Sequence, residues 1–450
     1  MRSVKIVFIG AGSISFGSSQ IQDFVLEPAL RGSTVVLVDT NAKALDLMTR
    51  FARRLNQALD AGLSIEATTD RRQALPEADF VITSVAVDRM VTWKKDFEIP
   101  LKHGVQHVLG ENGGPGGLSH TLRSVPLLLG IARDMEALCP AALFLNFTNP
   151  ESRICLALDR YTDIAYAGLC HGLCMGLEMI SDITGIEVAD LQGKAAGLNH
   201  FCWFLDIRRQ STGEDLYPLL RERESHYEPS GLHQESHILC RRLFRAFGLF
   251  PYAGDDHTGE YLPYAHEFCG TDGPPWERWD SEFSRFARRI REIADGTRPA
   301  PEVWDHAPTP EDCTPENVDH LGLFPSGEYA VSIITGMADN RDNYIPALNI
   351  RNDGCIENLP DWAVVEVPGI ASADGLRGLH MGVLPDACVA PLLTQVYVQS
   401  LAVDAAVKGS RELALQALLV DPVIQSWEAA EKILDELLEV HARYLPQFAT

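Results

Sequence analysis

The stretch Val4-Lys-Ile-Val-Phe-Ile-Gly10-Ala-Gly12-Ser13-Ile-Ser-Phe-Gly17 decides the fold of this 450-residue chain. Its apolar, β-branched run predicts a buried parallel strand, which leads directly into a turn with the pattern GxGxxxxG. In such a turn Gly10 allows the tight bend, and Gly12 lets the backbone approach a pyrophosphate closely. The helix expected from about residue 18 to 30 would point its first N–H groups at the phosphates. The stretch therefore predicts the start of a dinucleotide-binding Rossmann unit.

The segments that follow complete a mononucleotide-binding half. A second strand over residues 34–39 ends in Asp39, near the spacing at which this fold binds the hydroxyls of the adenosine ribose. An acid rather than Arg at this place favours NAD over NADP, although Lys43 follows closely. Further strands over 64–68 and 78–84 give the order βαβαβ. A glycine turn that binds nothing is the weaker alternative. The predicted cofactor-binding residues are Gly10, Gly12, Ser13 and Asp39.

Composition limits the possible partners and the number of domains. The net charge of −24 argues against nucleic acid and anionic membranes, but a local pocket can still bind an anionic substrate. No apolar run reaches the roughly 18 residues of a transmembrane helix. The ten unevenly spaced cysteines fit a reducing cytoplasm. We expect an α/β protein with a Rossmann-type parallel sheet in residues 1–195 and an α+β domain in residues 196–450, as in malate and lactate dehydrogenases.

Two polar residues follow apolar segments of the first half. Glu111 precedes a run with four glycines around Pro115, which predicts a loop at residues 113–117 with a helix behind it. Glu111 at its mouth is a candidate catalytic acid, and a flexible connector is the equal alternative. Asn149 ends a buried strand over 141–146. It would bind substrate hydroxyls or the nicotinamide ribose, or else cap the next helix.

Cysteine and histidine gather at the ends of two later strands. Cys170 and His171 follow a short strand, and His200 ends the stretch Lys194-Ala-Ala-Gly-Leu-Asn-His200. A thiolate and an imidazole suit Mn²⁺, Zn²⁺, Fe²⁺ or Co²⁺, and they are too few for a closed structural zinc site. An open site lets the substrate's oxygens complete the coordination shell. The alternative is a buried cysteine with two hydrogen-bonded histidines.

Together these motifs resemble glycoside hydrolase family 4, the NAD- and manganese-dependent α-glycosidases, and in particular its α-galacturonidase and α-glucosidase branch. The similarity extends over most of the chain, to about residue 420. The matching stretches are GxGS near residue 10, ExxGPGG at 111–117, NPxS at 149–152, GLCH at 168–171, GLNH at 197–200, GDDHTGEYLP at 254–263, SGE at 326–328, NDGCIENLP at 352–360 and VEVP at 365–368.

The resemblance implies a glycosidase that requires NAD and a divalent metal, usually Mn²⁺. NAD would oxidise the C3 hydroxyl of the sugar to a ketone, which acidifies the C2 proton. The metal would stabilise the enediolate while a base removes that proton and the leaving group departs from C1. Water would then add and the hydride would return to C3. The net reaction would be hydrolysis of an α-glycosidic bond.

The resemblance also implies site residues. Cys170 and His200 match the metal ligands, and Asn149 matches a substrate contact near the metal. Glu111 matches the acid that precedes the glycine run and assists departure of the leaving group. The stretch at residues 110–113, Gly-Glu-Asn-Gly, departs from the family's more usual Gln-acid-Thr.

The base and the sugar specificity stay open between alternatives. The residue that removes the C2 proton matches either Asp255 or Asp256. Within the family, CHS accompanies glucosides and galactosides and CHG accompanies uronides, so residues 170–172 favour an α-galacturonide or α-glucuronide over a neutral hexoside. His171 would face C6 of the sugar, where a protonated imidazole can pair with a carboxylate. Asn199 is a further candidate for substrate binding.

Two other function classes compete with the glycosidase. A net dehydrogenase of the malate or lactate type would release NADH in step with product. An NAD-sensing regulatory protein would bind NAD without needing Cys170, and it has no evident use for an open metal site. The expected partner is a small sugar substrate, and we expect a cytoplasmic homodimer or homotetramer.

Overall fold

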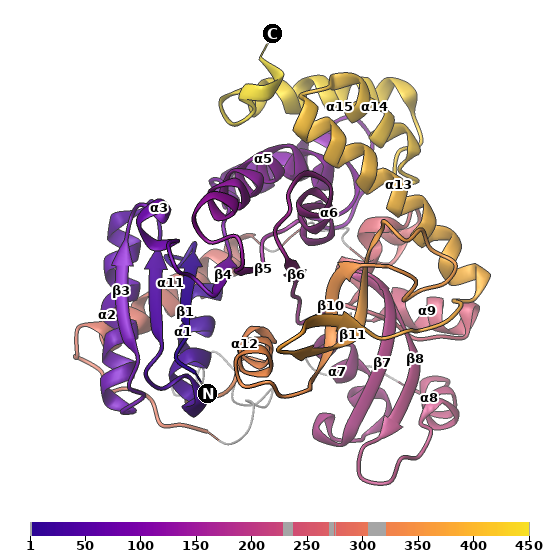
Figure 1. Ribbon diagram of the computed structural model, residues 1–450. Coiled ribbons are helices and arrows are strands. Elements are labelled where there is room, and N and C mark those ends of the chain that lie inside the picture. The colour runs from indigo at the N-terminus through magenta and orange to yellow at the C-terminus, as the bar shows by residue number, and fades with distance from the viewer. Residues whose placement is uncertain (1, 228–236, 270–273, 275, 305–320, 450) are drawn as a thin grey trace.

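One mixed sheet organises the molecule (Figure 1). The computed structural model describes residues 2–227, 237–269, 274, 276–304 and 321–449. The strand order is β3-β2-β1-β4-β5-β6-β10-β11-β7-β8-β9, and β12 pairs with the far end of β11. The sheet changes from parallel to antiparallel at the pair Asn349↔Gly168, where β10 joins β6.

The parallel part is the predicted Rossmann unit. Every residue of β4 and β5 is buried, because helices cover both faces of the sheet. The strands are β1 (Lys5–Ile9), β2 (Thr34–Val38), β3 (Ser64–Thr68), β4 (Phe80–Thr83), β5 (Leu143–Asn146) and β6 (Tyr166–Gly168). The helices are α1 (Phe16–Leu26), α2 (Ala42–Ala58), α3 (Arg71–Ala74), α4 (Arg89–Lys102), α5 (Gly114–Leu138) and α6 (Glu151–Tyr161).

The second half combines antiparallel strands with helices, which confirms the predicted α/β class with an α+β part. Its strands are β7 (Leu191–Leu198), β8 (Phe201–Arg209), β9 (Pro251–Tyr252), β10 (Asn343–Arg351), β11 (Val364–Ser372) and β12 (Gly375–Gly378). Its helices are α7 (Gly172–Thr184), α8 (Tyr217–Glu224), α9 (Ile238–Phe247), α10 (Asp255–Thr258), α11 (Trp276–Ala294), α12 (Ala330–Ala338), α13 (Asp386–Lys408), α14 (Arg411–Val420) and α15 (Trp427–Val440).

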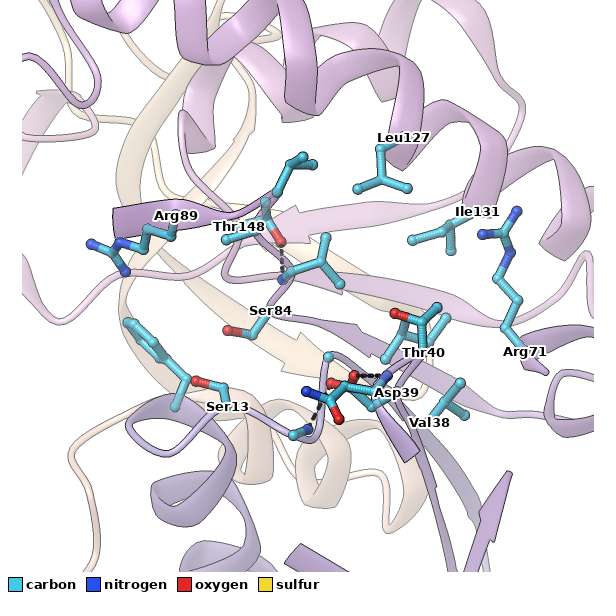
Figure 2. Close-up of a pocket in the computed structure, with 18 of the residues that line it drawn as sticks. Ser13, Val38, Asp39, Thr40, Arg71, Ser84, Arg89, Leu127, Ile131 and Thr148 are labelled. Atoms are coloured by element: carbon cyan, nitrogen blue, oxygen red, sulfur yellow. Dashed lines mark hydrogen bonds between the residues drawn. The ribbon is translucent and has the colours of Figure 1, made fainter. Parts of the chain in front are cut away.

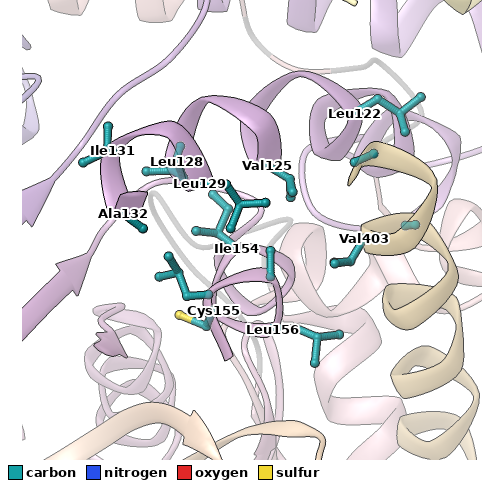
Figure 3. Close-up of a cluster of buried hydrophobic side chains, with 14 of the residues drawn as sticks. Leu122, Val125, Leu128, Leu129, Ile131, Ala132, Ile154, Cys155, Leu156 and Val403 are labelled. Carbon is teal, nitrogen blue, oxygen red and sulfur yellow. The ribbon is translucent and has the colours of Figure 1, made fainter. Parts of the chain in front are cut away.

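The C-terminal helices α13, α14 and α15 pack on α5 and α6 of the first half. Figure 3 shows Leu122, Val125 and Leu129 of α5 in the cluster that also holds Ile154 of α6 and Val403 of α13. The two halves therefore share a hydrophobic core. The predicted domain boundary between residues 195 and 196 falls inside β7, and the division at that point remains a prediction. Among the described helices, none combines the length and the apolar character needed to cross a membrane.

The glycine run after Glu111 differs from the predicted loop, because α5 already begins at Gly114. Pro115 is tolerated there because the first helical turn has no use for its missing N–H. The glycines allow close backbone packing: a Cβ added to Gly113 would lie 2.5 Å from the carbonyl oxygen of Glu260, and one on Gly116 would lie 2.4 Å from that of Gly110. The run is therefore a packed helix start.

Candidate functional site

A cavity of about 850 Å³ lies at the carboxyl ends of the parallel strands, where this fold binds its ligands. Figure 2 shows Ser13, Asp39, Ser84 and Arg89 around it. Its volume lies within the range of small-molecule sites. The residues predicted to bind the cofactor, namely Gly10, Gly12, Ser13 and Asp39, all line this cavity.

The walls of the cavity fit a dinucleotide. Gly10 has a φ of +92°, and a Cβ there would lie 2.0 Å from the carbonyl oxygen of Ser84. A Cβ on Gly12 would lie 2.6 Å from Oδ2 of Asp39, the atom that accepts the Gly12 N–H at 2.9 Å. Only glycine leaves this turn flat enough for a phosphate to reach the backbone. Asp39 both holds the turn and remains at the cavity wall, as ribose recognition requires.

Cys170 lies two residues after β6 and is not among the residues that line this cavity. Its thiol is hydrogen bonded to the backbone of Gly172 and to the side chain of Asn199, and burial together with Glu366 and Glu328 raises its pKa well above the ordinary value. A divalent cation would reverse that effect and favour the thiolate. The amide of Asn199 also donates to Glu366 Oε2 at 2.9 Å. Asn199 thus contacts Cys170 directly, and its predicted contact with substrate remains a prediction.

His200 occupies the tight turn between β7 and β8, where it has the left-handed φ of 64°, uncommon outside glycine. Its Nδ1 lies 3.2 Å from the Asn112 amide and 4.0 Å from Glu260 Oε2, and its ring centroid lies 4.3 Å from that of His257. Burial lowers the pKa of His200 well below its ordinary value, so the imidazole is neutral, the form that binds metals.

The donor atoms suit an open metal site. Asn199, which directly precedes His200, bonds the thiol of Cys170, so the two predicted ligands lie on adjoining parts of the site. Within the described part of the chain, no three or more His, Cys, Asp or Glu side chains gather as a metal site. One thiol and one imidazole leave coordination positions for substrate, as catalysis requires and as structural zinc sites do not.

The adjacent acids at the start of α10 have different surroundings. Asp255 is buried, and its two oxygens accept the N–H groups of Leu239 and Cys240, both at 2.9 Å, at the start of α9. The side chain of Asp256 is 51% exposed and its Oδ1 lies 2.7 Å from Nδ1 of His257. Burial opposes both charges, yet the pairing lowers the pKa of Asp256 to about 2 and raises that of His257 to about 9. Asp256 is therefore the ionised and accessible acid of the pair.

Glu111 and Asn149 both line the dinucleotide cavity. The Glu111 carboxylate accepts a hydrogen bond from Nη2 of Arg89 at 2.8 Å. The first residue before α6 is Pro150, and no side chain caps this helix, so Asn149 does not serve the capping role that was its alternative. Its side chain is left for a ligand.

His171 connects the cysteine motif to the glycine turn. Its ring centroid lies 6.5 Å from that of Phe16, the first residue of α1, which also lines the cavity. Its Nδ1 lies 3.0 Å from Oε1 of the buried Glu328, and this hydrogen bond raises the pKa of His171. The half-exposed imidazole lies beside a residue of the cavity wall, and its contact with Glu328 favours the protonated form, which can pair with an anionic group.

Several polar residues of the site were not predicted from the sequence. Arg89 and Asn112 carried no motif signal of their own. Glu328 and Glu366 lay within the matching stretches SGE and VEVP without an assigned role. Their burial marks Glu328 and Glu366 as residues of the site, because an acid seldom stays buried without partners. That burial is visible only in the structure.

The loop that carries Glu328 rests on a buried acid, which makes the stability depend on pH. Both the N–H and the hydroxyl of Ser326 donate to Asp23 of α1, and burial raises the pKa of Asp23 from 3.8 to about 7. The folded state therefore keeps a proton that the unfolded chain releases. This contribution is complete below pH 3.8 and is lost as the pH rises through about 7.

We expect Asp23→Asn, which cannot ionise, to gain stability relative to the wild type as the pH rises. The unfolded carboxyl is already ionised at pH 5 and the folded one ionises near pH 7, so the relative gain between pH 5 and pH 8 is at most about 3 kcal/mol. Urea unfolding of both proteins at the two pH values measures it. An equal stability difference at pH 5 and pH 8 would contradict the assignment.

Comparison with known proteins connects this geometry to a family. The sequence model "Family 4 glycosyl hydrolase" matches residues 5–186, and that of the C-terminal domain of the same family matches residues 195–424. The chain is 31% identical to an alpha-glucosidase of Erwinia rhapontici over 97% of both proteins, and 30% identical to an alpha-galactosidase of Bacillus subtilis over 99% of both. It is 26% identical to an alpha-galacturonidase of Thermoanaerobacter italicus over 99% of this chain and 98% of the relative.

Solved structures share the fold over nearly the whole chain. A 6-phospho-alpha-glucosidase from gut microorganisms, in complex with NAD and Mn²⁺, superimposes with a TM-score of 0.81 at 23% identity and covers 99% of both chains. A malate dehydrogenase from Plasmodium falciparum superimposes with a TM-score of 0.51 at 11% identity, over 91% of this chain and 99% of that one. The predicted dehydrogenase-like architecture is confirmed.

Proposed function

This chain belongs to family 4 of the glycosyl hydrolases, and from that premise we propose that it hydrolyses α-glycosides of a hexuronic acid with the help of NAD and a divalent cation. The observation that supports this most is a chain of contacts: Asn199, the neighbour of His200, is hydrogen bonded to Cys170, and the ring of His200 lies 4.3 Å from that of His257, the partner of Asp256. The cavity that Glu111 and Asn149 line has a glycine turn that suits a dinucleotide.

The proposed cofactors are NAD and Mn²⁺ or another divalent metal. Gly10, Gly12, Ser13 and Asp39 would hold the dinucleotide, and Cys170 with His200 would hold the metal. NAD accepts and returns a hydride at C3 of the sugar, and a divalent cation stabilises negative charge on oxygens next to the proton that is lost. The related structure with NAD and Mn²⁺ supports the choice of cofactors.

The protein's own side chains would move the protons. We assign the removal of the C2 proton to Asp256, since its carboxylate is ionised at neutral pH and its side chain is half exposed, whereas that of Asp255 is held by two backbone N–H groups. His257 orients this carboxylate through the 2.7 Å contact. We assign assistance of the leaving group to Glu111, held by Arg89 at the cavity wall. Asn149 would donate to a sugar hydroxyl.

His171 supports the uronide assignment. The pairing with Glu328 favours the imidazolium, which can bind the C6 carboxylate of a uronic acid. The glycine at 172 has a second explanation, because an added Cβ would lie 3.0 Å from Cβ of Ala253. Packing alone thus accounts for part of the CHG signature.

A neutral α-glucoside or α-galactoside is the second candidate substrate. Three relatives at 30–31% identity are named for these sugars, a fourth at 30% is named a probable 6-phospho-beta-glucosidase, and the alpha-galacturonidase shares 26%. The imidazolium of His171 would then donate to the C6 hydroxyl instead of pairing with a carboxylate.

A panel of p-nitrophenyl α-galacturonide, α-glucuronide, α-galactoside and α-glucoside tests the proposal. Protein freed of cofactors by chelation and gel filtration is assayed with and without NAD and Mn²⁺. We expect release of nitrophenol to require both, to be fastest with a uronide, and to leave no net NADH. Activity without either additive would refute the cofactor proposal, and accumulation of NADH in step with product would indicate a net dehydrogenase.

We further propose that the enzyme is a homodimer or homotetramer that uses helix α13 as a contact. Leu393 and Tyr397 lie one turn apart on α13 and are 36% and 50% exposed, and Val383 just before this helix is 63% exposed. Analytical ultracentrifugation gives the subunit number, and a purely monomeric protein at micromolar concentration would contradict this assembly.

A further inference from the structure

We propose that Asn112 and Glu260 are positioning residues that hold His200 with its proton on Nδ1, so that Nε2 is left free for the cation. This inference rests on the proposed metal dependence and assigns a role to two residues outside the predicted ligand set. The proposed role is to orient the imidazole of His200 and fix its tautomer, and neither residue binds the cation itself.

The first support comes from the Asn112 side chain, which lies in the buried start of the glycine run. Its Nδ2 is 3.2 Å from Nδ1 of His200, and its Oδ1 is buried without a partner among the described residues. Rotation of the amide about its last bond exchanges these two atoms with little change in shape. Oδ1 would then face Nδ1 and accept its proton, as the carbonyl partners of metal-bound histidines do.

The second support comes from Glu260, 148 residues further along the chain. Its Oε1 accepts the backbone N–H groups of Glu111, Asn112 and Gly113, at 2.5, 2.8 and 3.3 Å. This contact fixes the backbone that carries Asn112. Its other oxygen, Oε2, is buried without a hydrogen bond in the described part of the structure and lies 4.0 Å from Nδ1 of His200.

The two unpartnered oxygens point to one common solution. A buried acceptor without a hydrogen bond is costly, so two of them beside His200 require an explanation. Once the Asn112 amide is rotated, a proton on Nδ1 of His200 satisfies Asn112 Oδ1 and points its positive end toward the carboxylate of Glu260, whose Oε2 lies 4.0 Å away. The same proton leaves the lone pair of Nε2 for a cation. Asn112 and Glu260 thus select one tautomer of His200.

The proposal is tested by titrating metal-free protein with Mn²⁺. The electron paramagnetic resonance signal of the free ion reports how much Mn²⁺ stays unbound. We expect Asn112→Leu to weaken Mn²⁺ binding about 10–100-fold. Asn112→Asp keeps an acceptor at this place and should stay within about threefold of the wild type. Glu260→Gln keeps the shape but weakens the hold on the backbone, and we expect an intermediate loss.

A control substitution at another buried asparagine, together with the binding of NAD, distinguishes a role in positioning His200 from damage to the fold. Asn352 is also fully buried, and within the described part of the chain its side-chain amide bonds only to backbone groups of residues 356–360, so Asn352→Leu should lower Tm without changing Mn²⁺ affinity. NAD affinity, measured by calorimetry, should stay unchanged in every Asn112 variant.

The outcomes distinguish this inference from the proposed function. Folded Asn112→Leu that binds Mn²⁺ as tightly as the wild type overturns the positioning role. Loss of affinity in Asn112→Leu that Asn112→Asp fails to rescue also overturns it, because the acceptor would then not matter. Wild-type protein that binds no Mn²⁺ overturns the proposed metal dependence itself.

Discussion

Cys170→Ser is expected to lower kcat by about a thousandfold or more while NAD affinity stays within about twofold of the wild type. The serine hydroxyl does not ionise at neutral pH, so the site loses its anionic ligand. Metal stabilisation of charge contributes several kcal/mol to a transition state, and about 4 kcal/mol corresponds to a thousandfold in rate. The dinucleotide cavity is lined by other residues, so the binding of NAD should survive.

Cys174→Ser is the matched control for this experiment. Cys174 lies on α7, four residues after Cys170, and its Sγ is 3.8 Å from the hydroxyl of Tyr329, so it shares the partly buried setting without being a predicted ligand. We expect it to retain Mn²⁺ binding and most of the activity. Calorimetry with NAD and Mn²⁺, together with initial rates on the best substrate, compares the variants. Full activity in Cys170→Ser would remove Cys170 from the metal site.

The Rossmann half was predictable because its signals are local. Strand, glycine turn, helix and terminal acid follow one another within residues 4–39, and each has a composition that few other structures tolerate. The glycine run at 113–117 was misread for the opposite reason. Those glycines serve backbone contacts with Glu260 and Gly110, and only the first of these lies far away in sequence. From local sequence the run is indistinguishable from a loop.

The candidate site was predictable as a set of residues but not as a set of contacts. The motifs brought Cys170, His200 and Glu111 forward, whereas no pattern joins Asn112 to Glu260 across 148 residues. The shared core between the C-terminal helices and α5 is similarly long-range. Such pairings depend on how the sheet orders its strands, with β10 and β11 inserted between β6 and β7.

The adjacent acids Asp255 and Asp256 show most clearly that contacts cannot be predicted from sequence alone. Substitution of Asp256 is also the second change with a large expected effect on kcat. In sequence the two are equivalent candidates for the base. In the structure Asp255 accepts the N–H groups of Leu239 and Cys240 at the start of α9, whereas Asp256 faces His257 and solvent. We expect Asp256→Asn to lower kcat by about a thousandfold, within the range of a lost general base.

Asp255→Asn serves as the control, because the same change one position earlier should act on stability. The amide keeps one acceptor and loses the other together with the charge, so the start of α9 loses about 1 kcal/mol of stabilisation and Tm falls by a few degrees. Its kcat should stay within a few-fold of the wild type. Asp256→Asn breaks the contact with His257, so its Tm is measured in parallel to show that the loss of kcat occurs in folded protein.

Exchange of solvent deuterium separates a lost base from any other cause of inactivity. Removal of the C2 proton by Asp256 predicts deuterium at C2 of the sugar released by the wild type in D₂O, detected by mass spectrometry. In Asp256→Asn the exchange should disappear together with turnover, while Asp255→Asn should show it in full. The reverse pattern, with exchange retained in Asp256→Asn and lost in Asp255→Asn, would exchange the roles of the two acids. It would also require α9 to move, because the Asp255 carboxylate reaches the sugar only after it releases both N–H groups.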